Sequence, residues 1–218
     1  MPPDAGARAP DAHPTLAAEL RMRVVTTFRR RATLMVRDLS AADDAPAASH
    51  ARIARLDPAD IDAYLRLRPR ATRAGIEARM ARGDVAVAAW VDGRIAHAAW
   101  VATGRTHIPY LGCDLVLDAG EMLVHDSFTD PAHRHAGLAH ARMMWVFREW
   151  ARLGFRRCFA VVAEENEVGR RAMASAGYRE VGRYVCVRLG PWSRCRQVTE
   201  QGATLPRLVA HAARYAAR

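Results

Sequence analysis

The stretch that most constrains the fold runs from Glu121 to Ala139 and reads EMLVHDSFTDPAHRHAGLA. It opens with an apolar, strand-like run, which Pro131 ends because proline cannot donate to a sheet ladder. Small residues, Gly137 among them, then lead into a long segment with helical periodicity. The stretch therefore predicts a strand, a short turn and a helix. Such a turn gathers unpaired backbone N–H groups at the positive end of a helix dipole, which suits a phosphate group.

Length and composition narrow the class of protein. A chain of 218 residues, half of them hydrophobic, fits one ordinary domain with extensions and is not disordered throughout. The net charge of +10 could indicate a nucleic-acid partner, but all 33 basic residues are arginine and alanine is abundant, which is typical of GC-rich codon usage. No stripe of basic residues alternates with aromatic residues. We therefore expect a solvated basic surface and no nucleic-acid partner.

The four cysteines show neither C-x-x-C spacing nor the density of a disulfide framework. Cys158 and Cys186 lie in apolar, strand-like runs and are predicted to be small core residues. No signal peptide opens the sequence, and no apolar run is long enough to span a bilayer. These features predict reduced cysteines, a cytoplasmic location and no membrane partner.

The order of the remaining segments predicts an α/β (α+β) domain. The expected organisation is a disordered arm at 1–17, a single domain at 18–190 with its core at 51–190, and a C-terminal extension at 191–218 with an amphipathic helix. The expected helices are 19–31, one that begins after Asp57, 71–82, 138–153 and 166–176. The expected strands are 33–38, 51–56, 85–91, 95–101, 157–163 and 181–189, with an irregular extended stretch at 107–117 and a linker at 40–50.

Two local patterns sharpen this assignment. Asp92-Gly93 between two strands is a strong hairpin signal. Helix 138–153 is amphipathic. Its expected inward face carries Met143, Val146, Phe147, Trp150 and Leu153. Its expected outward face carries Arg142, Arg148, Glu149 and Arg152.

Two blocks of the sequence resemble one family. Arg134-x-x-Gly137-x-Ala139 after a strand resembles the acetyl-CoA-binding motif, Q/R-x-x-G-x-G/A, of the GNAT N-acetyltransferase superfamily. Residues 161–178 are similar to the second block of that superfamily, a strand, an Asn, a helix and a Gly-aromatic pair. The resemblance covers about 53–189. It implies the GNAT fold, a central mixed, twisted β-sheet with helices on both faces, and acetyl-CoA as co-substrate.

The resemblance also implies which residues bind the cofactor. In GNAT proteins two parallel strands splay apart after a bulge, and their unpaired backbone groups bind the pantetheine amides; Phe128 and Thr129 would do so here. The following turn would hold the pyrophosphate, with added charge from Arg134. Asn166 would lie beside the pantetheine arm, although it also suits a plain helix N-cap. The full set is Phe128, Thr129, Arg134, His135, Ala136, Gly137, Leu138, Ala139 and Asn166.

Catalysis requires that the acceptor amine lose its proton, because an alkylammonium with a pKa near ~10 does not attack a thioester. Members of the family often use a Glu on the strand before the phosphate turn. By strand parity Glu121 and His125 share one face, whereas Asp126 points the other way unless a bulge intervenes. Glu121 and His125 are therefore the candidate catalytic residues. The alternatives are a strand-end surface charge for Glu121 and a half-buried structural histidine for His125.

A general acid for the departing thiolate is harder to find. The family often supplies a Tyr seven residues after the Asn, and this sequence has Met173 there. We expect Met173 to be a core residue. Tyr184 or a water could act as the acid instead, and the sequence does not decide between them. No metal site is expected either, because His133 and His135 lack a third ligand at ordered spacing.

The predicted function is transfer of an acetyl group from acetyl-CoA to an amine by direct attack in a ternary complex. A GNAT module that binds or senses acyl-CoA without catalysis remains an alternative, as does a longer acyl donor. The acceptor would be a small molecule or a peptide, contacted by 57–82 and 106–118. A homodimer stays open.

Overall fold

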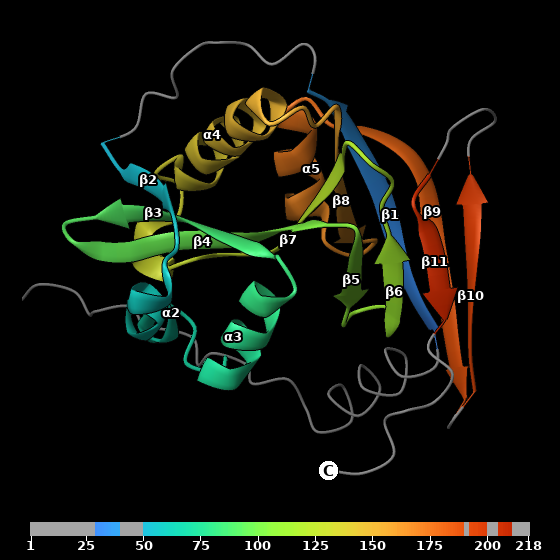
Figure 1. Ribbon diagram of the computed structural model, residues 1–218. Coiled ribbons are helices and arrows are strands. Elements are labelled where there is room, and N and C mark those ends of the chain that lie inside the picture. Colours follow the sequence, from blue (N-terminus) through green and yellow to red (C-terminus); the bar gives the residue numbers. More distant parts are fainter. Residues whose placement is uncertain (1–28, 40–49, 190–191, 200–204, 211–218) are drawn as a thin grey trace, which may run out of the picture.

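The computed structural model describes residues 29–39, 50–189, 192–199 and 205–210 (Figure 1). Its strands are β1 (Arg29–Asp38), β2 (Arg52–Arg55), β3 (Val85–Val91), β4 (Arg94–Thr103), β5 (Arg105–Ile108), β6 (Cys113–Val116), β7 (Glu121–Thr129), β8 (Arg157–Ala163), β9 (Arg179–Leu189), β10 (Trp192–Thr199) and β11 (Arg207–Ala210). Its helices are α2 (Ile61–Leu67), α3 (Arg73–Ala81), α4 (Leu138–Arg152) and α5 (Glu167–Ser175), with short 3₁₀ turns at Pro58–Asp60 and Pro131–His133. No helix in these ranges is long and apolar enough to cross a membrane.

An eight-stranded sheet in the order β10-β9-β1-β8-β7-β4-β3-β2 forms the centre, and a second sheet has the order β11-β6-β5. Helices α4 and α5 cover one face of the large sheet, where α4 packs on β3, β4 and β7 (Figure 1). Helices α2 and α3 cover β3 and β4 on the other face, and the small sheet covers β1, β8 and β9 there. The predicted fold class is therefore confirmed.

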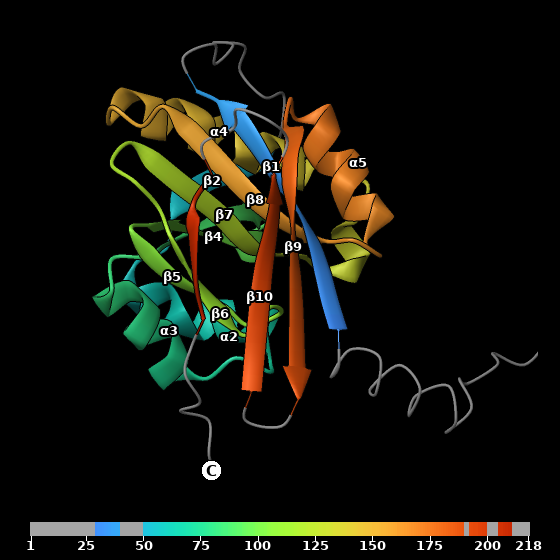
Figure 2. The same cartoon turned by 90° about the vertical axis from the view of Figure 1, so that its right-hand side faces the viewer.

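Strand β1 lies outside the stretch that resembles the GNAT family, yet it occupies the interior of the large sheet. It pairs antiparallel with both neighbours, so that Leu34 lies opposite Val161 of β8 and Gly182 of β9. Figure 2 shows β1 beside β9, and β10 lies on the far side of β9. The predicted strand 33–38 is confirmed. The predicted helix 19–31 is wrong at Arg29–Arg31, which belong to β1, and the rest of it lies outside the described residues, as do the arm 1–17 and most of the linker.

The C-terminal region differs from the prediction. Leu208 and its neighbours form β11, which pairs with β6 so that Leu208 lies opposite Leu115, and not an amphipathic helix. A short apolar run with spacings of three and four residues is compatible with a helix or a strand. Here it forms a strand because it pairs with the apolar strand β6. The remainder of that predicted helix, 211–218, lies outside the described residues. Strand β10, which the sequence did not indicate, pairs with β9.

The buried stripe of α4 also corrects a prediction. Arg142, expected on the outward face, is 0% exposed. Its position explains this, because Leu138, Arg142, Val146 and Trp150 follow one another at four-residue spacing and all four are buried. Leu153, expected inside, is 59% exposed because it follows the last helical residue. The helix therefore buries a cation where periodicity alone would place an apolar residue.

The local signals for turns and caps are confirmed. Asp92 and Gly93 both have positive φ, 47° and 74°, as a tight hairpin between β3 and β4 requires. Asn166 caps α5 through its side-chain oxygen, which accepts a hydrogen bond from the Gly169 N–H at 2.9 Å. Pro58 opens a 3₁₀ turn that continues into α2. Short-range stereochemistry thus sets the element boundaries at these three places.

Candidate functional site

The candidate site begins where β7 and β8 separate. The two strands are parallel and pair at four positions, from Glu121 with Arg157 to Val124 with Ala160. Beyond that point β7 continues to Thr129 and β8 to Ala163, but no register between them is formed among the described residues. Phe128 and Thr129 pair with β4 on their other side. Their edge towards β8 therefore leaves main-chain groups available for a ligand.

A bulge in β7 lies at the point of separation. His125 pairs with Trp100 and Phe128 pairs with Ala98, so two residues of β7 oppose a single position of β4. Asp126, within the bulge, has a φ of 52°, a left-handed conformation that costs a non-glycine residue of the order of 1 kcal/mol. Bulges of this kind re-aim a side chain and are frequent beside active sites. Here the side chain of Asp126 turns towards α2 and α3.

The turn between β7 and α4 presents main-chain N–H groups at the start of a helix, and phosphate binding there stays a prediction. His135 and Gly137 have φ values of 65° and 71°, and α4 begins at the next residue, Leu138. The first bond across this helix start runs from the Ala141 N–H to the Gly137 carbonyl, so the N–H groups of residues 138–140 have no acceptor within the helix. No atom lies within 4 Å of a Cβ added at Gly137, so the space above the turn is open. Successive N–H groups in such a turn form an anion-binding concavity.

Thr129 at the end of β7 is held by a buried polar chain. His97 of β4 has its Nδ1 2.8 Å from the Thr129 Oγ1, and the Arg142 Nε lies 3.3 Å from the His97 Nε2. Arg142 has no acceptor function, so its N–H donates to Nε2 and the proton of the neutral ring must be on Nδ1. Burial, and then the charge of Arg142, lower the pKa of His97 to about 3. These hydrogen bonds hold the end of β7 against α4.

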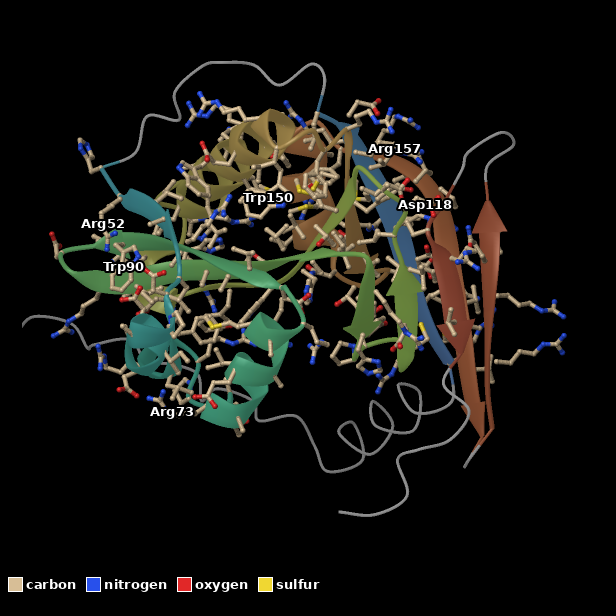
Figure 3. All side chains as sticks on the ribbon, in the orientation of Figure 1. Arg52, Arg73, Trp90, Asp118, Trp150 and Arg157 are labelled. Atoms are coloured by element: carbon tan, nitrogen blue, oxygen red, sulfur yellow. A yellow bond between two sulfur atoms is a disulfide. The ribbon has the colours of Figure 1, made fainter. Side chains whose placement is uncertain are left out.

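The predicted catalytic residue Glu121 lies away from the bulge. It is 3% exposed and opens β7 at the end where the strand is still paired with β8. Its carboxylate binds Arg157 and accepts a hydrogen bond from the Asp118 N–H at 2.9 Å. Figure 3 shows Asp118 and Arg157 together at this end of the sheet. This set of partners gives Glu121 a role in joining β7, β8 and the loop before β7.

His125 lies at the bulge, on the face covered by α2 and α3. Burial lowers its pKa to about 4, with further lowering by Arg79 and Arg82 and a smaller opposing effect of Asp126. The ring is therefore neutral at pH 7. Its Nε2 is buried and has no hydrogen-bond partner among the described residues. Of the two predicted residues, the structure thus brings only His125 to the place where β7 and β8 part.

A pocket of about 230 Å³ opens beside the bulge, between α2 and α3. Its apolar walls include Tyr64 and Trp100, whose polar atoms satisfy each other because the Trp100 Nε1 donates to the Tyr64 Oη at 2.8 Å. Asp126 reaches into this pocket and binds Arg68 at 2.8 Å and Arg79 at 2.6 Å. The sequence pointed to 57–82 as the acceptor region but did not indicate this cluster. The only signal for it in the sequence is that a bulge in the strand would turn Asp126 to the face of His125.

Met173 and Asn166 occupy structural positions in α5. Met173 is partly buried and packs against the core cluster that includes Phe147 and Tyr178, in agreement with the prediction. The Tyr178 hydroxyl lies 2.9 Å from the Cys158 Sγ, and burial raises the pKa of both groups. Asn166 acts as the N-cap of α5, and a contact of Asn166 with a pantetheine arm stays a prediction.

Cys158 is a free, buried core residue, as predicted, but two of the other cysteines are not reduced as expected. Cys186 of β9 forms a disulfide with Cys195 of β10, directly across the strand pair. Strand β10 was not anticipated, so the pairing of these residues could not be seen in the sequence. The Cys113 Sγ lies within 4.8 Å of both sulfur atoms, but burial raises the pKa of this thiol to about 12. Two of these three sulfur atoms are joined in the disulfide, so they offer no thiolate to a metal ion.

Comparison with solved structures identifies the architecture. A GCN5-related N-acetyltransferase from Sphaerobacter thermophilus matches with a TM-score of 0.53 and 18% identity, over 84% of this chain and 57% of that one. A protein from Novosphingobium aromaticivorans assigned to the GNAT family of acetyltransferases matches with a TM-score of 0.52 and 16% identity, over 79% of this chain and 66% of that one. This chain has the GNAT fold.

Other comparisons add little to this result. A functionally unknown conserved protein from Staphylococcus epidermidis matches with a TM-score of 0.53 and 12% identity, over 80% of this chain and 67% of that one. No protein-family model matches the sequence, and no curated protein sequence matches it either. The chain spans less than two thirds of the length of the two GNAT proteins named above. At these identities the GNAT structures share a fold with this chain and do not indicate its acceptor.

Proposed function

We propose that this GNAT chain is a CoA-dependent N-acetyltransferase that transfers an acetyl group from acetyl-CoA to an amine by direct attack in a ternary complex. The observation that carries the proposal is the separation of β7 from β8 after Val124 and Ala160, followed by the left-handed turn into α4. A gap with free main-chain edges next to a helix N-terminus offers amide partners and a phosphate site in one continuous surface.

Different residues of this surface would bind different parts of the cofactor. The main chain of Phe128 and Thr129 would bind the pantetheine amides, and the N–H groups of residues 135–139 would bind the pyrophosphate, since the Arg134 N–H already donates to the Pro131 carbonyl at 3.4 Å. Arg134 is exposed at the turn and would add a charge-assisted contact. Asn166 at the start of α5 would lie beside the pantetheine arm.

The transfer step requires a free amine. Its nitrogen attacks the thioester carbonyl carbon, a C–N bond forms, the C–S bond breaks, and the thiolate of CoA leaves. His125 is the proposed acceptor of the amine proton, because it lies at the bulge and its Nε2 has no hydrogen-bond partner among the described residues. Its lowered pKa makes it a weak base, so it would take the proton only as the C–N bond forms and the nitrogen becomes more acidic. We do not assign this role to Glu121, since its carboxylate is already engaged by Arg157 and the Asp118 N–H. With Met173 at the position of the usual acid, solvent would protonate the thiolate, whose ordinary pKa of about 8.5 makes acid assistance dispensable.

Binding of acetyl-CoA tests the cofactor assignment. Acetyl-CoA should raise the melting temperature by mass action, and Gly137→Glu should remove this shift because it places a carboxylate over the phosphate-binding turn. The variant also strains a position with a φ of 71°. Gly104→Glu is the matched control, because Gly104 has a φ of 77°, is equally open and lies in the loop between β4 and β5. A folded Gly137→Glu protein that keeps the full shift would refute the assignment.

Turnover tests the activity separately. Release of CoA thiol in the presence of amines distinguishes an enzyme from a module that only binds or senses acyl-CoA. Comparison of acetyl-CoA with longer acyl-CoA donors tests the acyl chain. A protein that binds acetyl-CoA but releases no thiol with any amine would favour the sensing alternative.

A further inference from the structure

The pocket between α2 and α3 is strongly unbalanced in charge. Its lining includes three arginines, Arg68, Arg70 and Arg79, and one acidic residue, Asp126, which leaves two net positive charges. Neighbouring charges on the same helices are balanced, since Arg73 pairs with Asp62 and Glu77. The excess of positive charge is therefore a property of the pocket and not of these helices in general.

The arginines of the pocket retain capacity for a ligand. Asp126 takes one hydrogen bond from Arg68 and one from Arg79, whereas each guanidinium carries five N–H donors in a planar fork. The side chains of Arg68, Arg79 and Asp126 are 29%, 25% and 26% exposed, so a small molecule can reach them. Arg70, in the turn between α2 and α3, is exposed and has no hydrogen-bond or ion-pair partner among the residues that the structure describes.

We infer that this pocket binds a small acceptor amine that also carries a carboxylate or phosphate group. The inference rests on the proposed acetyl transfer and names the class of its acceptor. The anionic group would lie on Arg70 and on the open donors of Arg68 and Arg79, which suit planar or tetrahedral oxyanions. The apolar walls, Tyr64, Ile76 and Trp100, suit the carbon body of the acceptor.

Asp126 offers the amine end of the acceptor a partner in the same pocket. Each oxygen of the Asp126 carboxylate is bound by a single arginine and keeps room for an amine N–H. The strained bulge thus places the Asp126 carboxylate, which accepts hydrogen bonds, among the arginine donors and beside the point where β7 separates from β8. A second positive charge on the acceptor would be repelled by the arginines, so polyamines should be poor substrates.

Four matched amines test the inference through acetylation and through binding. They are 4-(aminomethyl)benzoate, 4-(aminomethyl)phenylphosphonate, the neutral 4-(aminomethyl)benzamide and the dication 1,4-bis(aminomethyl)benzene. We expect kcat/KM for an anionic amine to exceed that of the neutral amide by about tenfold or more, the size of one or two charge-assisted hydrogen bonds. Comparison of the carboxylate compound with the phosphonate compound shows which oxyanion the pocket prefers.

Variants of Arg70 assign the preference to the pocket. Arg70→Ala should reduce the advantage of the anionic amine about tenfold by raising KM, and Arg70→Lys should restore part of it because the charge returns without the fork. Arg66→Ala is the control, since Arg66 is exposed on α2 outside the pocket lining. Arg70 is exposed in a turn, so these variants should fold.

Calorimetric binding of the same four compounds to the protein without cofactor separates this inference from the proposed function. Anion-selective binding that Arg70→Ala abolishes would support the pocket even if no acetylation occurred, and the proposed function alone would then fail. Equal or tighter binding of the neutral amide or the dication would overturn the inference, whatever the enzyme does with acetyl-CoA. Anion selectivity that persists in Arg70→Ala and equals that of Arg66→Ala would overturn it as well.

Discussion

The two sides of the candidate site are built from different parts of the chain. The cofactor side, from the end of β7 through the turn into α4, offers main-chain N–H groups whose directions follow from His135 and Gly137 in left-handed conformations. The acceptor side offers charged side chains from α2, α3 and the bulge of β7, brought together around Asp126. Main-chain recognition tolerates changes of side chain, whereas the acceptor pocket depends on a few individual groups. Substitutions should therefore affect the two sides in separable ways.

The largest separable effect is expected at Asp126. Asp126→Asn keeps the shape of the side chain but removes the charge between Arg68 and Arg79, so the acceptor amine loses a charged partner. We expect turnover to fall by roughly 100-fold, about 2.7 kcal/mol in transition-state free energy, while the shift in melting temperature caused by acetyl-CoA stays unchanged. Steady-state kinetics measures the turnover, and a thermal-shift titration measures the binding of acetyl-CoA.

The control for Asp126 is another arginine–aspartate pair on the same helices. Asp62 binds Arg73 at 2.5 Å, but the two side chains are 72% and 48% exposed. An exposed pair contributes only about 0–1 kcal/mol, so Asp62→Asn should leave both turnover and cofactor binding near the wild-type values. A loss of acetyl-CoA binding in Asp126→Asn would show that the two sides are not separable.

The difference between the two sides also decides what the sequence could predict. Pro131 and Gly137 act on their neighbours through stereochemistry, so the strand, turn and helix from 121 to 152 were predicted from local pattern. The acceptor pocket combines Arg68, Arg79 and Asp126, whose proximity depends on the sheet register and on one bulge. Strand parity places Asp126 on the wrong face, and no local signal marks the bulge.

The errors in the fold have a similar origin. Strand β1 joins β8 and β9 across more than 100 residues of sequence, as in the pairing of Leu34 with Val161, and such pairing leaves no local trace. The burial of Arg142 does not follow from its residue type, because arginine is rarely buried, although its place in the four-residue stripe of α4 points inward. Long-range contacts, and not element type, thus limited the prediction.

A second prediction concerns Met173, on the cofactor side of the comparison. Met173 is partly buried against the core cluster around Phe147 and Tyr178, so Met173→Tyr should overpack this region and cost about 1–3 kcal/mol of unfolding free energy. We expect no gain in turnover. Chemical denaturation and kinetics at saturating substrate measure the two quantities; a faster enzyme of unchanged stability would instead indicate that a general acid is missing.

Acid should destabilise the protein through two histidines, His97 on the cofactor side and His125 on the acceptor side. Burial lowers the pKa of His97 to about 3 and that of His125 to about 4, whereas both rings protonate near 6.5 in the unfolded chain. Between pH 6.5 and about 4 the unfolded chain therefore binds more protons, so the unfolding free energy falls as the pH falls. Each histidine contributes a slope of about 1.4 kcal/mol per pH unit.

A variant of His97 can assign part of this slope to the cofactor side. His97→Gln keeps polar atoms near Thr129 and Arg142 but does not titrate, so the loss of stability between pH 6 and 4 should become less steep by about one histidine. His140→Gln is the control, because His140 is exposed on α4. Denaturant unfolding at several pH values provides the measurement. An unchanged slope in His97→Gln would mean that His97 is not held neutral in the folded protein.

The smallest effect is expected at Arg134, and it sharpens the comparison most directly. If the turn binds phosphate through main-chain N–H groups, the exposed side chain of Arg134 adds only a solvent-screened contact, worth about 0.2–1 kcal/mol. Arg134→Gln should then weaken acetyl-CoA binding only a few-fold, more at low salt than at high salt, and should leave turnover at saturating acetyl-CoA unchanged. Arg94→Gln, in the exposed hairpin between β3 and β4, controls for the change in net charge. A loss as large as that caused by Gly137→Glu would contradict main-chain recognition, and the cofactor side would then depend on individual side chains as much as the acceptor pocket does.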